Sequence, residues 1–167
     1  TVVAPTGLTF TAVDSSLIAS NDLHGAQWWA VGDGSTNSFT IAWDDAEGCW
    51  CGSIVIDGAD LSSPIDVFAQ DEVTASFPSG FTSPSVTTTV DDCLGLRVAA
   101  THSLATLARP DDGQLEVFNG GSGSDTVNDV AAAMTEEGFD TAGAQGTESF
   151  TSSTGRHWYG LTTAIAP

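Results

Sequence analysis

The chain has 167 residues, which is enough for one domain with a sizeable core, because a chain of this length buries roughly 70% of its unfolded surface. It carries 22 acidic residues against three basic ones, none of them lysine, and its formal net charge is −19. Such a surface repels phosphate groups, so the composition excludes nucleic acid and anionic membranes as partners.

The apolar residues occur in runs of about five to nine, which is the length of strands and too short for a membrane-spanning helix of ~20 residues. Turn-forming residues separate these runs, so we predict an all-β antiparallel sandwich that occupies residues 1–167 as a single domain. The acidic excess is typical of a protein from a saline habitat, where screening over about 10 Å or less relieves self-repulsion. It is equally typical of an ordinary acidic bacterial or viral surface protein.

Two strands are predicted near the N-terminus, after short apolar clusters around Pro5-Thr6-Gly7. Residues 27–31 form the first strand, and residues 38–43 alternate as its hairpin partner. Trp28 and Trp29 point to opposite faces of the first strand, so one is expected in the core and the other at the surface. We predict Trp28, together with Tyr159 near the C-terminus, as exposed aromatic contacts.

Residues 49–56 form the apolar run around which the other strands are expected to pack. The run predicts a buried strand, because alternate residues divide between two faces, and it ends at the Asp57-Gly58 turn. One face carries Trp50, Ile54 and Ile56, and the other carries Cys49, Cys51 and Val55.

Further strands are predicted over residues 86–90, 93–100, 147–151 and 157–165, with residues 93–100 as a second core strand. Residues 125–138 are ambiguous. Their apolar side chains have the spacing of a helix, whereas the neighbouring segments are all typical of strands. On pattern alone both structures remain open for this segment.

The three cysteines are an odd number, so at least one thiol is free or pairs outside the chain. Cys49 and Cys51 lie on one strand face in a geometry unsuited to bonding each other. Either one is able to meet Cys93 from a neighbouring strand, and Cys51 with Cys93 is the disulfide hypothesis. A zinc site that adds His102 lacks a fourth ligand and is the weaker interpretation.

The acidic turn after residue 43 is the candidate metal site. Asp44, Asp45 and Glu47 supply the oxygen ligands that Ca²⁺ takes, although their spacing is not that of an EF-hand, and a hydrated acidic turn is the competing interpretation. No other cofactor is implied. The chain has no G-x-S-x-G elbow and no phosphate loop with lysine, so we expect no enzymatic activity. Each of its three arginines is expected to pair with a carboxylate.

A series of motifs occurs along the chain in this order: Trp29-Ala30-Val31-Gly32-Asp33-Gly34, Gly58-Ala59-Asp60, Pro64-Ile65-Asp66, Leu94-Gly95-Leu96-Arg97-Val98 and the closing Trp158 to Ile165. Their order resembles a β-sandwich module, jelly-roll-like in form, that recurs in bacteriophage virion and tail proteins. The resemblance covers about residues 27–167 and implies a strand at residues 125–137. Such modules usually begin with an extra apolar strand ahead of the Pro5-Thr6-Gly7 turn, which here is either encoded before Thr1 or supplied by a neighbouring subunit through β-addition.

The resemblance implies a structural protein on the outer, extracellular surface of a tailed-phage virion. The expected role is capsid decoration, or a tail or fibre component, that acts by multivalent assembly. Its partners are then copies of itself and other virion proteins such as the major shell protein. The alternative is a secreted carbohydrate-binding or adhesion module, in which exposed aromatic residues bind a glycan.

Overall fold

The computed structural model describes residues 2–14, 23, 25–34, 38–43, 50–73, 78–102, 107–108, 115–122, 130–155 and 157–167. These residues form antiparallel β-sheets and contain no helix, so the predicted all-β class is confirmed. Within this part of the chain there is accordingly no helix that is long and apolar enough to cross a membrane.

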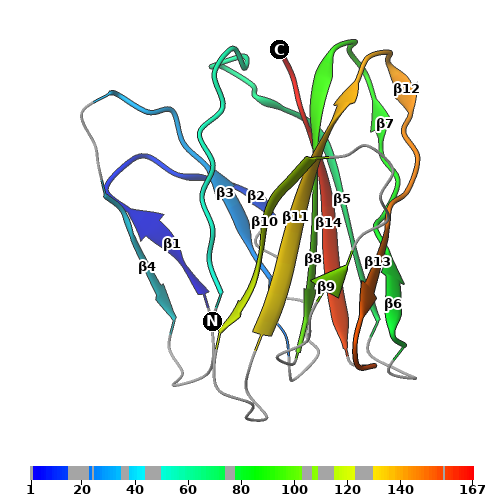
Figure 1. Ribbon diagram of the computed structural model, residues 1–167. Helices are drawn as coiled ribbons and strands as arrows, with labels where there is room; N and C mark the ends of the chain where they lie inside the picture. The colour runs from blue at the N-terminus through cyan, green and yellow to red at the C-terminus, as the bar shows by residue number, and fades with distance from the viewer. Residues whose placement is uncertain are drawn as a thin grey trace.

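A five-stranded antiparallel sheet lies at the centre of the molecule (Figure 1). Its registers run without a slip through the three inner strands. Both outer pairs contain a β-bulge, where the pairing shifts by a residue. The strand order is β10 (Leu115–Ser122), β11 (Val130–Phe139), β8 (Cys93–Thr101), β14 (Trp158–Ile165) and β5 (Ile65–Val73).

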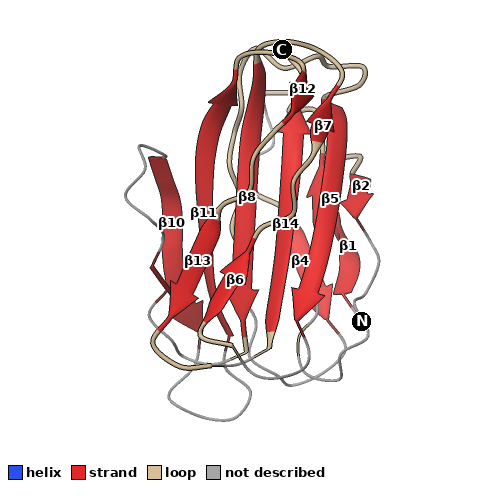
Figure 2. Ribbon diagram, turned by 90° about the vertical axis from the view of Figure 1, so that its right-hand side faces the viewer, coloured by secondary structure: helices blue, strands red, loops and turns tan. Residues whose placement is uncertain are grey.

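Short strands cover one face of this central sheet and complete the sandwich (Figures 1 and 2). Between the layers lies an apolar cluster in which Trp158, Phe81 and Phe150 are all less than 5% exposed. The covering strands are β6 (Gly80–Thr82), β13 (Ser149–Ser152) and β9 (Leu107–Ala108) in one sheet, and β7 (Thr87–Thr88) with β12 (Gly143–Ala144) in another.

The N-terminal strands cover the opposite face of the central sheet, which gives the molecule a third layer (Figure 1). β1 (Val2–Thr6) pairs with β4 (Thr40–Trp43), and β2 (Thr11–Asp14) pairs with β3 (Gln27–Trp29). Leu23 packs against Tyr159 and Leu161 of β14 on this face. The hydroxyl of Thr163 donates a hydrogen bond of 2.7 Å to the side-chain oxygen of Gln27.

Because both faces are covered, β14 is buried at all eight of its positions and β8 at seven of nine. An antiparallel sheet often leaves one face to water. The strands predicted at residues 93–100 and 157–165 are confirmed as β8 and β14. They lie at the centre of the fold. Of the segment left open between helix and strand, the described residues 130–138 belong to strand β11, as the resemblance implied.

The predicted organising strand at residues 49–56 is wrong for the described residues 50–56, which form no strand. Val55 is fully exposed and Cys51 is exposed. The ring of Trp50 lies over Gly52, where a Cβ would overlap it, and packs against Phe118 of β10 at a tilt of 35°, with ring centroids 4.1 Å apart. Trp50 is thus half-buried by contacts of its side chain with Gly52 and Phe118, without the backbone pairing that a strand needs.

The predicted hairpin between residues 27–31 and 38–43 is also wrong. Both segments contain strands, but β3 pairs with β2 and β4 pairs with β1. Alternation places a residue on a face of a strand and says nothing about which strand lies beside it.

Aromatic rings lie flat against glycines at several points in these layers. Phe139 covers Gly95, Phe81 covers Gly160 and Tyr159 covers Gly25, and in each case a Cβ on the glycine would overlap the ring. The missing side chain lets the ring approach the strand backbone, so these glycines set the spacing between the layers.

Replacing Gly95 with alanine is expected to lower the free energy of unfolding by about 1–3 kcal/mol, because the added methyl group overpacks the contact with Phe139. Gly80→Ala is a matched control in a strand, since the nearest atom to its Cβ is the carbonyl oxygen of Phe150 at 3.5 Å. Urea unfolding of both variants measures the difference. Equal stability changes in the two variants would contradict the claim that the packing of the Phe139 ring requires a glycine at position 95.

Candidate functional site

The candidate calcium ligands Asp44, Asp45 and Glu47 lie outside the described residues, so the site stays a prediction. Elsewhere, in the residues that the structure does describe, no three His, Cys, Asp or Glu side chains gather as they would around a metal ion. The zinc interpretation was built on Cys49, Cys51, Cys93 and His102. Cys49 lies outside the described residues, and the other three do not gather as metal ligands.

The disulfide expected between Cys51 and Cys93 is not formed, and both residues are free cysteines. Cys93 is buried with Val86 and Phe139 between the two layers of the sandwich. Trp50, next to Cys51 in the chain, packs on the opposite face of the central sheet. Burial raises the pKa of the Cys93 thiol, and the nearby carboxylate of Asp66, 3.9 Å from the sulfur, raises it further.

The aromatic residues expected at the surface are not exposed. Tyr159 is 4% exposed, because the N-terminal layer covers the face of β14 from which it projects. Trp28 is half-buried, and so is Trp29, so the expectation of one core and one surface tryptophan is wrong. Of the two, Trp29 lines an open hollow.

This hollow lies in the N-terminal layer and has a volume of about 700 Å³. Thr11 of β2 and Trp29 of β3 are direct cross-strand partners, which places their side chains on the same face of the β2–β3 ribbon. The lining residues are Gly7, Leu8, Thr9, Thr11, Trp29, Val31 and Asp33.

One wall of the hollow is held in place by an aromatic contact. Phe39 packs edge-on against Phe10, with ring centroids 5.7 Å apart. Gly7, with φ of +120°, brings the turn between β1 and β2 close to the backbone of Ser38 and Phe39. The sequence pattern did not single out Trp29, although the Trp-Trp pair was an available signal. Which side of the strand faces solvent depends on how the layers stack, and the pattern does not specify this.

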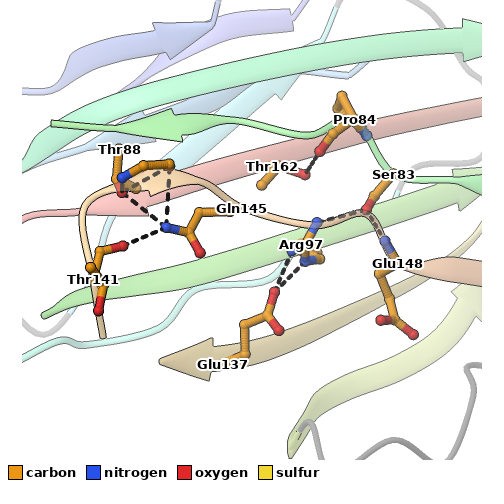
Figure 3. A network of polar contacts seen from close by, with 10 residues as sticks. Ser83, Pro84, Thr88, Arg97, Glu137, Thr141, Gln145, Glu148 and Thr162 are labelled. Carbon is orange, nitrogen blue, oxygen red and sulfur yellow. Dashed lines mark hydrogen bonds and ion pairs between the residues drawn. The ribbon is translucent and has the colours of Figure 1, made fainter. Parts of the chain in front are cut away.

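A buried network of polar side chains lies between the layers of the sandwich (Figure 3). Arg97 of β8 is 2% exposed, and its Nε–H donates to Glu137 of β11 at 2.6 Å. A second guanidinium nitrogen forms an ion pair with the same carboxylate. Another donates to the hydroxyl oxygen of Ser83 at 3.0 Å, which also accepts the backbone N–H of Glu148 at 2.9 Å.

This network joins the central sheet to the layer that covers it, because Ser83 and Glu148 flank strands β6 and β13 of that layer. The ring of Phe139 lies 5.4 Å from the guanidinium carbon and adds a cation–π contact. The expectation that Arg97 pairs with a carboxylate is confirmed. Because Arg97 contacts both layers, the arrangement is suited to holding them together.

The two edge strands of the central sheet differ in the features that oppose pairing with a further strand. The described residues add no strand beyond either edge. β5 carries three acidic residues and a bulge at Asp66, whose carboxylate turns to accept the backbone N–H of Thr89 at 2.7 Å. β10 carries one acidic residue, Glu116, and begins at Leu115, which is 62% exposed.

No match to this chain is found among protein-family models, curated proteins or solved structures. Three features of the described chain therefore remain as the basis for a functional proposal: the hollow around Trp29, the buried Arg97 network and the open edge at β10. The Arg97 network has an evident structural role, which leaves the hollow and the edge as the candidate contact sites.

Replacing Glu137 with leucine is expected to lower the free energy of unfolding by about 3 kcal/mol, because it leaves a buried guanidinium without its anion. This is the lower end of the range for buried pairs, since the Glu137 side chain is 25% exposed. The double variant that adds Arg97→Met is expected to recover most of the loss. Urea unfolding of the four proteins gives the coupling energy, and strictly additive changes would contradict this role for the pair.

In the native protein at pH 8, iodoacetamide is expected to alkylate Cys51 and to leave Cys93 largely unreacted. Burial blocks the reagent at Cys93, and the raised pKa shifts the thiolate population to higher pH than in the unfolded chain. Peptide mass spectrometry measures both sites, with the urea-unfolded protein as the control in which both react. Rapid labelling of Cys93, or a Cys51–Cys93 linked peptide, would refute the placement of these residues.

Proposed function

We propose that this chain is a structural protein on the surface of a tailed-phage virion, either a capsid decoration protein or a tail or fibre component. The observation that supports this proposal is the unequal protection of the two edges of the central sheet. Because both faces of the sheet are already covered, another chain is able to extend it at an edge alone.

An exposed edge strand offers unpaired backbone groups to a strand from another chain. Charges and bulges on an edge oppose such pairing. β5 has both devices, with Asp66, Asp71 and Glu72 along its length. β10 has a bulge near Glu116 but a single charge, and its exposed Leu115 offers an apolar contact. We therefore assign the assembly contact to β10.

The charge of −19 fits this role, because an acidic exterior stays hydrated and repels further copies once the surface is filled. Contacts between such chains gain little from surface charge, so backbone pairing and apolar burial carry them. Each contact is then weak, and many identical contacts on one particle supply the stability. The partners in this proposal are copies of the chain and the major shell protein, at an extracellular location.

Quantitative mass spectrometry of density-purified particles from the source material tests the proposal directly. We expect this chain in the particles, and its copy number relative to the major shell protein distinguishes the positions. A ratio in the hundreds identifies a decoration protein, and a handful of copies identifies a tail or fibre component. Absence of the chain from the particles would refute the virion role.

The same particles test the β10 contact. Leu115→Lys places a charge on the proposed edge, and we expect it to reduce the retained copies severalfold. Leu61→Lys is the matched control, because Leu61 is 70% exposed and lies in a bend outside the sheets. Both variants change the net charge equally, so a loss confined to Leu115→Lys is due to the edge. Equal retention of the two variants would place the contact elsewhere.

A further inference from the structure

We propose that the hollow around Trp29 binds a pyranose ring of a neutral glycan, with the indole of Trp29 as its stacking surface. This inference does not depend on the virion role, because it rests on the geometry of the N-terminal layer. It gives the chain a ligand-binding function beyond assembly.

The lining of the hollow combines the two kinds of group that a sugar ring needs. A pyranose has an apolar face of C–H groups, which packs on an aromatic ring, and a rim of hydroxyls, which need hydrogen-bond partners. Trp29 supplies the ring, and Thr11, its direct cross-strand partner, supplies a hydroxyl that both donates and accepts. Thr9 and Asp33, both exposed, add a second hydroxyl and a carboxylate to the lining.

The size and accessibility of the hollow also fit a sugar. Its volume of about 700 Å³ lies within the range of roughly 300–1,000 Å³ that is typical of small-molecule sites. It is open to solvent, as a site must be if the bound ring belongs to a longer glycan. Leu8 and Val31 line it as well, and Val31 is 45% exposed, so apolar surface extends beside the indole.

Electrostatics select the class of sugar. The carboxylate of Asp33 contributes to the lining, and the whole chain carries a charge of −19. A sugar acid brought to this surface is repelled, whereas a neutral sugar is not. We therefore infer a neutral hexose as the ligand and expect its binding to be insensitive to salt.

Binding is tested by titrating the ¹⁵N-labelled protein with neutral trisaccharides of glucose, mannose and galactose, and with the trimer of galacturonic acid as the anionic probe. The chain has five tryptophans, and Trp29→Phe assigns the indole N–H signal of Trp29. We expect at least one neutral trisaccharide to shift this signal saturably, at both low and high salt. The galacturonate trimer is expected to leave it unchanged.

Variants then identify the residues that bind. Trp29→Ala is expected to weaken binding at least about tenfold, and Thr11→Val about threefold to tenfold through the loss of one hydrogen bond. Thr82→Val is the matched control, because it removes an exposed strand hydroxyl from the layer on the other side of the central sheet. Should Trp29→Ala fail to fold, the pair Thr11→Val and Thr82→Val still decides the question.

Three results would overturn the inference. The first is that no neutral trisaccharide shifts the Trp29 signal. The second is that Thr11→Val and Thr82→Val bind with equal affinity, which would place the sugar elsewhere. The third is that the galacturonate trimer binds as tightly as the neutral sugars, which would refute the selection by charge. None of these results bears on whether the chain is present in particles.

Discussion

The arrangement of this protein depends on one constraint, which is that its central sheet is covered on both faces. β14 is buried at every position, so each residue of the strand must suit an interior. The strand meets this demand with aromatic and aliphatic side chains and with threonines whose hydroxyls find partners across the layers, as Thr162 does with the carbonyl oxygen of Pro84 at 2.6 Å. The same constraint restricts contact with other molecules to the outer layers and to the edges of the sheet.

The covered sheet also determines the surroundings of one of the few cationic residues. The chain has three basic residues, and one of them, Arg97, is placed in the interior rather than on the surface. Its ion pair with Glu137 and its hydrogen bond to Ser83 offset the cost of removing its charge from water. Because the pair is neutral, the other 21 acidic residues and two arginines still carry the whole net charge of −19. The arginine thus holds two layers together without changing the balance of charge in the rest of the chain.

The sequence identifies the strands of the core better than it identifies their neighbours. Residues 93–100 and 157–165 are dense in apolar side chains, and both are strands as predicted, although only the first of them was predicted to lie in the core. The alternating run at residues 49–56 gave an equally good pattern, yet its described residues 50–56 form no strand, and the half-buried Trp50 packs on Gly52 and Phe118 instead. Tyr159 and Trp29 were misjudged for a related reason. Which face of a strand meets solvent depends on a third layer that no local pattern specifies, so the candidate site was found from the structure.

The two contact sites that we propose lie on different parts of the molecule. β10 is at one edge of the central sheet, whereas β2, which carries Thr11, belongs to the N-terminal layer and lies on the other side of the view from β10 in Figure 2. An added strand at β10 would therefore leave the hollow open to solvent. A single sugar ring in an open hollow gains little free energy, but copies fixed side by side on a particle would engage one glycan surface many times over. Assembly through the edge is thus the condition under which a weak sugar site becomes an effective one, and the geometry permits both contacts at once.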